Sequence, residues 1–329
     1  RHSLRDITMR SPLAILALIG TAAAARAQNT TDTRLLSQPA VSATRVAFNY
    51  AGDLWSAKLD NTDVRRLTTA DGDETAPFFS PDGSLIAFSG NYDGNTDVYV
   101  ISATGGAPRR LTFHPGVDVA QGFSPDGKRV LFVSTRNGAT TTNAQLWTVP
   151  VEGGMEEMLP IPNATQATYS PDGRRVAYNP LARAFDQWKR YRGGRVSQIW
   201  LYTSGTHATE KVPQPASRSN DVDAMWIGDA IYFRSDRDGE FNVWAYDLKS
   251  KQLRQVTHYA DFPVLNASAG GGKIVYEQAG WLHLLDPATG QSRKLAIGVA
   301  ADLRETRARW ASGNQYIRSA SISPTGARA

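Results

Sequence analysis

The sequence predicts an all-β protein, a six-bladed β-propeller of four-stranded blades, from two observations. First, the tetrapeptide Ser-Pro-Asp-Gly occurs at residues 80–83, 124–127 and 170–173, at intervals of 44 and 46 residues. A repeat of about 40–45 residues is typical of a four-stranded propeller blade. Second, short runs of β-forming residues flank each copy and alternate with polar, glycine-rich stretches. Regularly spaced strands with turn signals between them indicate an all-β fold.

The repeated tetrapeptide is interpreted as a corner between two strands, with no chemistry of its own. Proline presets φ at the second position of a type I turn, and aspartate suits the third position. Glycine accepts the left-handed conformation that follows. A related Ser-Pro-Thr-Gly at residues 323–326 would be the same corner in a further blade.

The strands of each blade follow in a fixed order. A second strand comes directly after the corner, at residues 45–48, 85–88, 130–133, 176–178, 230–233 and 273–276. A third strand follows a polar stretch, at residues 53–55, 97–100, 145–148, 198–201, 242–244 and 281–284. A short fourth strand closes the blade, as at residues 109–112. The pattern predicts six complete units, with no strand left for the last blade to borrow and with Phe88, Phe132 and Tyr178 at equivalent core positions.

The two ends of the chain differ from the repeats. Residues 1–27 are interpreted as upstream residues and a signal peptide, because Met9-Arg10 precedes a short apolar run and a small-residue site at Ala25-Arg26-Ala27. An N-terminal amphipathic helix is the alternative. Residues 28–300 form the six-bladed propeller, residues 301–315 a linker, and residues 316–329 the truncated start of a second propeller with its first strand. We therefore expect a periplasmic or secreted protein with no membrane span after signal removal.

The overall charge gives no reason to expect a nucleic-acid partner. The formal net charge is +5 and the pI is about 9.4, but residues 1–27 contain four arginines and one aspartate, and their removal leaves +2. The chain has no cysteine. That composition fits a periplasmic protein without disulfides and does not exclude a cytosolic one.

No catalytic, cofactor or metal site is predicted. The sequence has neither a Gly-x-Ser-x-Gly nucleophile elbow nor a His-Glu-x-x-His pair, and its five histidines are scattered. Residues 122–128 match part of a phosphate loop, but Arg129 replaces the required Ser or Thr. Acidic stretches at residues 93–97 and 236–239 lack the closing glutamate of a calcium loop. No catalytic residue, cofactor or metal ligand is therefore assigned.

One segment breaks the repeat, at residues 179–194 between the second and third strands of blade four. It lengthens that blade by an aromatic and cationic stretch that could grip acidic or peptide ligands at the rim of the ring. The candidate substrate contacts are Trp188, Tyr191, Arg192 and Arg195. The alternative is a structural loop that packs on the neighbouring blade or on an adjacent domain.

The same segment carries a family resemblance. The run Gln-Trp-Lys-Arg-Tyr-Arg-Gly-Gly-Arg at residues 187–195, followed by Ile199-Trp200, resembles the blade-four segment of tricorn-type serine peptidases. Residues 231–239 and residues 286–290 resemble the same family. The Trp-Lys-x-Tyr-Arg-Gly-Gly run is the specific part, because Ser-Pro-Asp-Gly corners are shared with many propellers. The resemblance covers about residues 35–309.

The resemblance implies a six-bladed propeller, then a seven-bladed one, then PDZ-like and mixed α/β domains that carry the serine peptidase site. In such enzymes the propellers filter and conduct peptides, and the subunits assemble into homo-oligomeric rings. None of the family's catalytic residues falls in this chain. The family can also present paired arginines that bind the carboxyl end of the substrate, but the matching loop at residues 113–117 has no arginine. Anchoring of that kind is not expected here.

Three functions remain open from the sequence. The first is a non-catalytic propeller that gates peptides or unfolded polypeptide and scaffolds the remaining domains of an exported tricorn-like serine peptidase. The second is a periplasmic protein-interaction propeller of the Tol–Pal type, with no enzymatic activity. The third is the propeller of an exported amidohydrolase. The insertion and the repeat start after residue 315 favour the first, and the short stretch before blade one disfavours the second.

Overall fold

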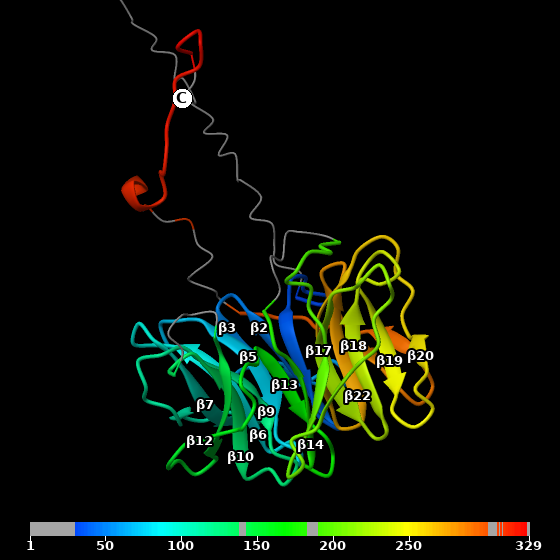
Figure 1. The fold of residues 1–329 in the computed structure, drawn as a ribbon. Helices are drawn as coiled ribbons and strands as arrows, with labels where there is room; N and C mark the ends of the chain where they lie inside the picture. The colour runs from blue at the N-terminus through cyan, green and yellow to red at the C-terminus, as the bar shows by residue number, and fades with distance from the viewer. Residues whose placement is uncertain are drawn as a thin grey trace, which may run out of the picture.

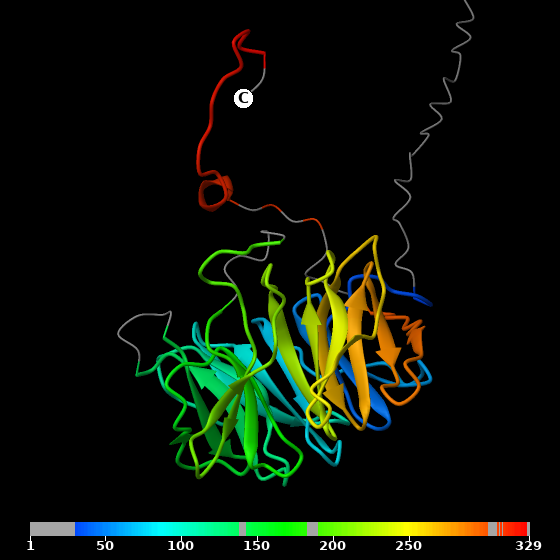
Figure 2. The same cartoon turned by 45° about the vertical axis from the view of Figure 1, so that its right-hand side comes forward.

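The structure, a computed structural model, describes residues 30–137, 143–182, 190–301, 308, 310 and 312–327. In this part of the chain, 24 strands form six separate four-stranded antiparallel sheets. The sheets stand around a common axis as the blades of a ring (Figures 1 and 2). The predicted six-bladed propeller is confirmed. The predicted signal peptide lies outside the described residues.

Each blade consists of four strands that are consecutive in the chain. Blade one has β1 (Ser37–Val41), β2 (Arg45–Tyr50), β3 (Asp53–Lys58) and β4 (Arg65–Arg66). Blade two has β5 (Glu74–Phe79), β6 (Leu85–Asn91), β7 (Thr96–Ser102) and β8 (Arg109–Arg110). Blade three has β9 (Asp118–Phe123), β10 (Arg129–Ser134), β11 (Gln145–Pro150) and β12 (Glu157–Met158).

The other three blades follow the same order. Blade four has β13 (Gln166–Tyr169), β14 (Arg175–Asn179), β15 (Trp200–Thr203) and β16 (Thr209–Lys211). Blade five has β17 (Asp221–Ile227), β18 (Ala230–Ser235), β19 (Asn242–Asp247) and β20 (Leu253–Gln255). Blade six has β21 (Val264–Gly270), β22 (Lys273–Gln278), β23 (Trp281–Leu285) and β24 (Ser292–Lys294).

The hydrophobic core lies between the blades. Each second strand contributes one buried aromatic ring, and these are Phe48, Phe88, Phe132, Tyr178, Phe233 and Tyr276. The facing residues in the third strands are Trp55, Tyr99, Trp147, Trp200, Trp244 and His283. In blade two the paired rings stack with their centroids 5.6 Å apart. The equivalent core positions predicted for Phe88, Phe132 and Tyr178 are confirmed.

The Ser-Pro-Asp-Gly corners also join neighbouring blades, which the sequence did not reveal. Gly127 and Gly173 have φ of 71° and 69°, the left-handed region that glycine favours. A Cβ atom at Gly127 would lie 3.6 Å from Pro81, and one at Gly173 would lie 3.7 Å from Pro125. Each glycine therefore packs on the proline of the preceding blade. We call the face of the ring that carries these corners the corner face.

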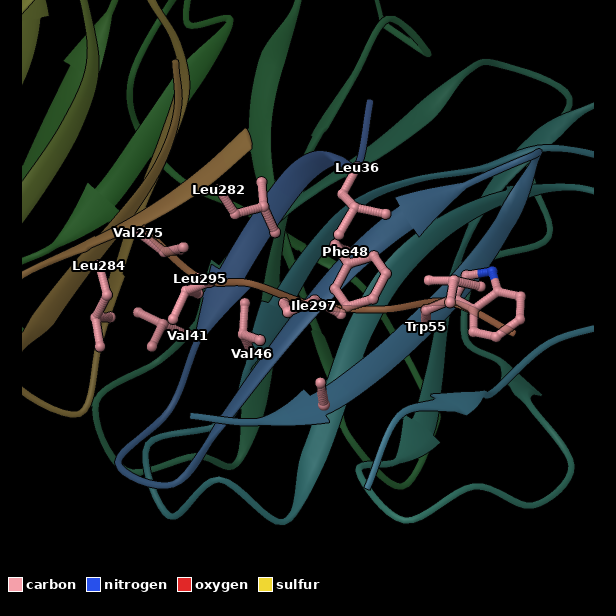
Figure 3. Packing of buried hydrophobic residues seen from close by; sticks show 12 residues of the cluster. Leu36, Val41, Val46, Phe48, Trp55, Val275, Leu282, Leu284, Leu295 and Ile297 are labelled. Carbon is pink, nitrogen blue, oxygen red and sulfur yellow. The ribbon is translucent and has the colours of Figure 1, made fainter. Parts of the chain in front are cut away.

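The junction of blade six with blade one, which we call the seam, closes the ring without a shared strand. Leu295, Ile297 and Val299 follow β24 and are buried among blade-one residues such as Val46 and Phe48 (Figure 3). Hydrogen bonds hold the chain before β1 against this segment. The amide of Thr33 donates to the Ile297 carbonyl at 2.8 Å, and the amide of Val299 donates to the Thr33 hydroxyl at 2.8 Å. Every sheet of the described residues consists of four consecutive strands, as expected from the sequence.

Close backbone approach at the seam requires glycine. A Cβ atom at Gly298 would lie 1.7 Å from the Thr30 carbonyl oxygen, and one at Gly270 would lie 1.9 Å from that of Val41. Neither distance is compatible with any side chain. The Gly-Gly-Gly sequence at residues 270–272 therefore replaces the Ser-Pro-Asp-Gly corner where blade six meets blade one.

The described residues 312–327 contain a 3-10 turn, η2 (Gly313–Gln315), and no strand. The expected first strand of a second propeller, from Tyr316, is not formed. A strand needs a partner for its backbone groups, and none lies beside it here. Its Ser-Pro-Thr-Gly corner is present, with the Gly326 amide donating to the Ser323 carbonyl at 2.8 Å. The assignment of residues 316–329 to a second propeller stays a prediction. Among the described residues, no helix has the length and apolar character of a membrane span.

Candidate functional site

The first strands β1, β5, β9, β13, β17 and β21 contact one another in succession and surround the axis of the ring. In all of them except β13, a bulge interrupts the pairing with the second strand. A bulge re-aims the side chain of the extra residue. Polar side chains stand at the bulges of four blades, at Gln38, Gln121, Asp223 and Asn266. Gln166 begins the regular strand β13 of blade four. We call these five residues the polar collar. Ala76 occupies the position in blade two.

The polar collar links most neighbouring blades through side-chain hydrogen bonds; between blades two and three, Ser89 of β6 accepts from the amide of Ala120 instead. Gln38 Oε1 accepts from the amide of Ala76 at 2.7 Å, and Gln121 Oε1 accepts from the amide of Ala167 at 3.2 Å. Gln166 and Asp223 bond reciprocally, because Gln166 Nε2 donates to Asp223 Oδ1 at 2.8 Å and Gln166 Oε1 accepts from the Asp223 amide at 3.2 Å. These bonds fix the inner strands and leave a polar wall around the axis.

Asp223 is the most heavily engaged member of the polar collar. Its second carboxylate oxygen pairs with the buried Arg234 guanidinium and accepts from the amide of Ala267 at 3.3 Å. Arg234 also donates from Nη1 to the carbonyl of Val264 at 3.0 Å. The pair therefore ties blade five to blade six through fully hydrogen-bonded charges, the arrangement in which buried ions are tolerated.

Glu277 makes the corresponding link across the seam, between blade six and blade one. Its Oε1 accepts from the Gln38 amide at 2.5 Å and from Asn266 Nδ2 at 2.8 Å. Burial raises the pKa of this carboxyl, opposed by these hydrogen bonds and by the nearby Arg234. A buried carboxylate thus bridges blades six and one at the point where no strand crosses.

The inner strands enclose a channel along the axis of the ring. A cavity of about 490 Å³ lies in this channel at its corner-face end. Aromatic side chains of four blades line it, namely Phe78, Phe123, Tyr169 and Trp226. Polar groups such as Gln121 and Thr168 stand among them. Burial raises the pKa of Tyr169 to about 12, so its hydroxyl stays protonated at neutral pH. The cavity therefore offers apolar surface together with neutral hydrogen-bonding groups and the carboxylate of Asp223.

A second cavity of about 290 Å³ lies where the insertion begins. Its lining combines Leu181 and Ala182 of the insertion with Arg234 and Asn266 of blades five and six. Among the lining residues, only Gln166 and Asp223 border both cavities. The hydrogen-bonded Gln166–Asp223 pair therefore stands between the two cavities.

The end of the insertion is anchored on blade five. Nη1 of Arg192 pairs with Asp236 Oδ2 at 2.7 Å, and its Nη2 donates to the Asp236 carbonyl at 3.1 Å. Asp236 is almost completely buried. Asn220 Nδ2 donates to the carbonyl of Tyr191 at 3.0 Å. Arg192 is thus engaged in a structural brace, while its side chain keeps 30% of its surface exposed, so its role as a ligand contact stays a prediction.

The other predicted contacts differ in position. Tyr191 is half-buried, and its hydroxyl accepts from the amide of Arg195 at 3.3 Å. A Cβ atom at Gly193 would lie 2.4 Å from that hydroxyl, so a larger residue there would displace the tyrosine ring. Arg195 is exposed. Trp188 lies outside the described residues, and the other three candidates lie together at the end of the insertion.

The polar collar is the part of the site that sequence reasoning missed. Its only signal was a polar residue shortly before a corner, as at Gln38 before Ser42 and Gln166 before Ser170. No group of three potential metal ligands occurs in the described parts of the chain. What the described residues offer on the axis is a lining of aromatic and polar side chains.

Comparison with known sequences identifies the family of this chain. The profile of the family described as the tricorn protease N-terminal beta propeller domain matches residues 33–291. The chain belongs to this family. Two curated relatives are a tricorn protease homolog of Saccharolobus solfataricus, 28% identical over 288 residues, and tricorn protease homolog 1 of Streptomyces coelicolor, 29% identical over 272 residues. These alignments cover 84% and 80% of this chain but only 26% and 25% of the relatives.

Solved structures agree with this assignment. The tricorn protease crystal structure superimposes with a TM-score of 0.70 at 25% identity, over 82% of this chain and 27% of that one. TolB from Acinetobacter baumannii gives a TM-score of 0.56 at 17% identity, over 76% of this chain and 62% of that one, which shows a shared propeller fold alone. The tricorn-type chain described here spans about a quarter of the length of its curated relatives.

Proposed function

We propose that this chain is the non-catalytic propeller of an exported tricorn-like serine peptidase, where it gates peptide substrates and scaffolds the remaining domains. Family membership supports the parent enzyme, and the share of the relatives that is covered supports further domains. Hydrolysis is assigned to those other domains. The chain alone should therefore hydrolyse no peptide or ester, and turnover that a serine-directed inhibitor abolishes would contradict this.

The observation that carries the gating role is the cavity of about 490 Å³ in the channel. An extended peptide exposes its backbone amides and carbonyls on all sides, and it needs both apolar contacts and hydrogen-bonding partners. The aromatic rings of Phe78, Phe123 and Tyr169 supply the first, and Gln121 and Thr168 supply the second. The ligand expected here is a short extended segment of peptide or unfolded polypeptide.

A substitution that fills the channel tests this role. Thr168 is half-buried in β13 and lines the cavity. We expect Thr168→Trp to weaken binding of fluorescein-labelled extended peptides at least tenfold in fluorescence anisotropy. Thr206→Trp makes the same change at an exposed turn of the same blade and should leave binding unchanged. Equal affinity for peptides in both variants, or no peptide binding by the unsubstituted chain, would contradict the proposal.

Arg195 remains a candidate peptide contact at the rim, because it is exposed beside the anchored end of the insertion. Trp188 and Tyr191 remain candidates from the sequence alone. The likeness to TolB supports the alternative of a protein-interaction propeller at the level of fold only. Retention of a folded envelope protein by the chain, insensitive to Thr168→Trp, would favour that alternative.

Export and assembly form a separate part of the proposal. We propose that a signal peptide is cleaved after Ala27 and that the parent protein is a homo-oligomeric ring. The small-residue site before Gln28 supports cleavage. Mass spectrometry of exported protein should give Gln28 as the first residue, and an intact Met9 terminus would contradict it. Analytical ultracentrifugation of the parent protein tests the ring, which a monomer would exclude.

A further inference from the structure

The exposed apolar side chains of the ring concentrate on one of its two faces. Two connections in each blade lie at the end of the sheet opposite the corners. One joins the second and third strands, and the other leads to the next blade. We call the face that carries these connections the loop face. Six large apolar residues are exposed on it: Leu35, Phe113, Val117, Leu181, Phe262 and Leu265. The described part of the corner face and its outer edge expose only Met155 and Met158 in this way.

Leu35 is held out into solvent by the backbone itself. It is 76% exposed with φ of 64°, a left-handed conformation that is unfavourable for leucine. Its amide donates to the carbonyl of Gly280 at 2.9 Å, which fixes this conformation at the seam. An exposed leucine in a strained conformation contributes little to the core of the ring. Its side chain is placed for contact with something outside the ring.

Part of the loop face is hollowed. Leu181 and Asn266 border the cavity of about 290 Å³, and Leu265 precedes Asn266 in β21. Phe262, 58% exposed, lies just before the same strand. The apolar part of this concave site comes from Leu181 and Ala182 of blade four and Val222 of blade five, while the exposed Phe262 and Leu265 belong to the chain segment that carries Asn266. This combination of exposed apolar groups and concavity is typical of a protein-binding surface.

The chain leaves the ring on this same face. β24 is a fourth strand and ends there, and Val299 is the last fully buried residue of the seam. Tyr316 follows 17 residues later, and a chain of that length spans at most about 60 Å. Tyr316, Ile317 and Ile322 are themselves exposed and apolar. A connection of this length keeps the polypeptide that contains these three residues near the loop face, at an effective concentration of about millimolar.

We propose that the loop face is the docking surface for the polypeptide that continues from Tyr316, which is the next domain of the parent chain. This inference rests on the proposed function, because it requires the longer peptidase. The corner face, with its large cavity, would then remain open to solvent. The short tether favours this occupant over a second copy of the chain, since a second copy has no such advantage in concentration.

Hydrogen–deuterium exchange tests the proposal on the parent protein and on the chain ending at Ala329. Peptides covering residues 112–117, 178–182 and 260–266 should exchange at least tenfold more slowly in the parent protein. Peptides covering the corners at residues 80–84, 124–128 and 170–174 should exchange equally in both proteins. Equal exchange on the loop face in both, or slower exchange confined to the corners, would overturn the proposal.

A matched pair of variants makes the test specific. Phe262→Ser combined with Leu265→Ser in the parent protein should increase the rate of cleavage of residues 301–315 by added protease at least fivefold. Met155→Ser changes a residue that is 82% exposed on the corner face and should leave that rate unchanged. The melting temperature of the chain ending at Ala329 should not change in any variant. Equal cleavage rates in all parent proteins would contradict docking.

Two further outcomes separate this inference from the proposed function. A parent protein that hydrolyses peptides but shows no loop-face protection overturns docking and leaves the peptidase function standing. A protected loop face in a parent protein without peptidase activity supports docking and overturns the peptidase function. If the chain ending at Ala329 dimerises and the Phe262→Ser, Leu265→Ser variant does not, the occupant is a second copy and the proposal is wrong.

Discussion

At the scale of single residues, one aromatic side chain in each second strand dominates the packing of the ring. Phe132 is fully buried between blades two and three, whereas Phe113 of the adjoining loop is 71% exposed. We expect Phe132→Ala to lower the free energy of unfolding by about 3–5 kcal/mol, the usual range for a buried phenylalanine. Phe113→Ala, the same change at the surface, should cost less than about 1 kcal/mol. Urea unfolding of both variants checks this, and similar losses would contradict the packing described.

A single carboxyl at the seam gives the ring a pH dependence. Because burial raises the pKa of Glu277 above its ordinary 4.5, ionisation opposes folding. Its contribution to stability is therefore complete below pH 4.5 and is lost as the pH rises through the higher value in the folded protein. Glu277→Gln keeps an oxygen for the bonds from Gln38 and Asn266 and removes the ionisation.

The comparison is made by urea unfolding of both proteins from pH 4 to pH 8. The stability of the unsubstituted protein should fall relative to that of Glu277→Gln as the pH rises. A difference that stays constant over this range would show that Glu277 does not titrate in the way its burial requires.

At the scale of elements, the insertion in blade four is braced by a contact with blade five. Arg192→Ala should lower the free energy of unfolding by about 1–3 kcal/mol, because it leaves the buried carboxylate of Asp236 without its cationic partner. Arg195→Ala, the matched change at an exposed arginine, should cost about 0.5 kcal/mol or less. Thermal and urea unfolding measure both, and an Arg192→Ala variant as stable as Arg195→Ala would exclude the brace.

The strands were predictable from the sequence, while their mutual contacts were not. Corner prolines, β-forming runs and a regular interval are local signals, so all six blades and the core position of Phe132 followed from them. The contact between Arg192 and Asp236 joins residues 44 positions apart and has no local signal. The polar collar depends on bulges at residues such as Gln38 and Asp223, which alternation of polar and apolar residues does not reveal. The candidate contacts were chosen by residue type alone, which does not distinguish a brace from a ligand contact.

At the scale of the whole molecule, stability depends on a seam that no strand crosses. Gly298→Ala would place a Cβ atom 1.7 Å from the Thr30 carbonyl, so the backbone must move and the terminal segment before β1 must separate from blade six. We expect a loss of at least about 2 kcal/mol. Gly194→Ala, where no atom lies within 4 Å, should be nearly neutral. The free energies of unfolding of both variants decide this, and a neutral Gly298→Ala would show that the seam is not closed as described.

The same seam bears on how rings of this kind can change size. Every sheet is built from four consecutive strands, so no sheet is shared between the beginning and the end of the chain. Duplication or loss of one repeat, 44 residues from Ser80 to Ser124, would add or remove a complete sheet and leave no strand unpaired. A gene encoding such a chain can therefore move between neighbouring blade numbers by one unequal recombination, and every contact between blades, including those at Gly270 and Gly298, would then adapt to the new curvature.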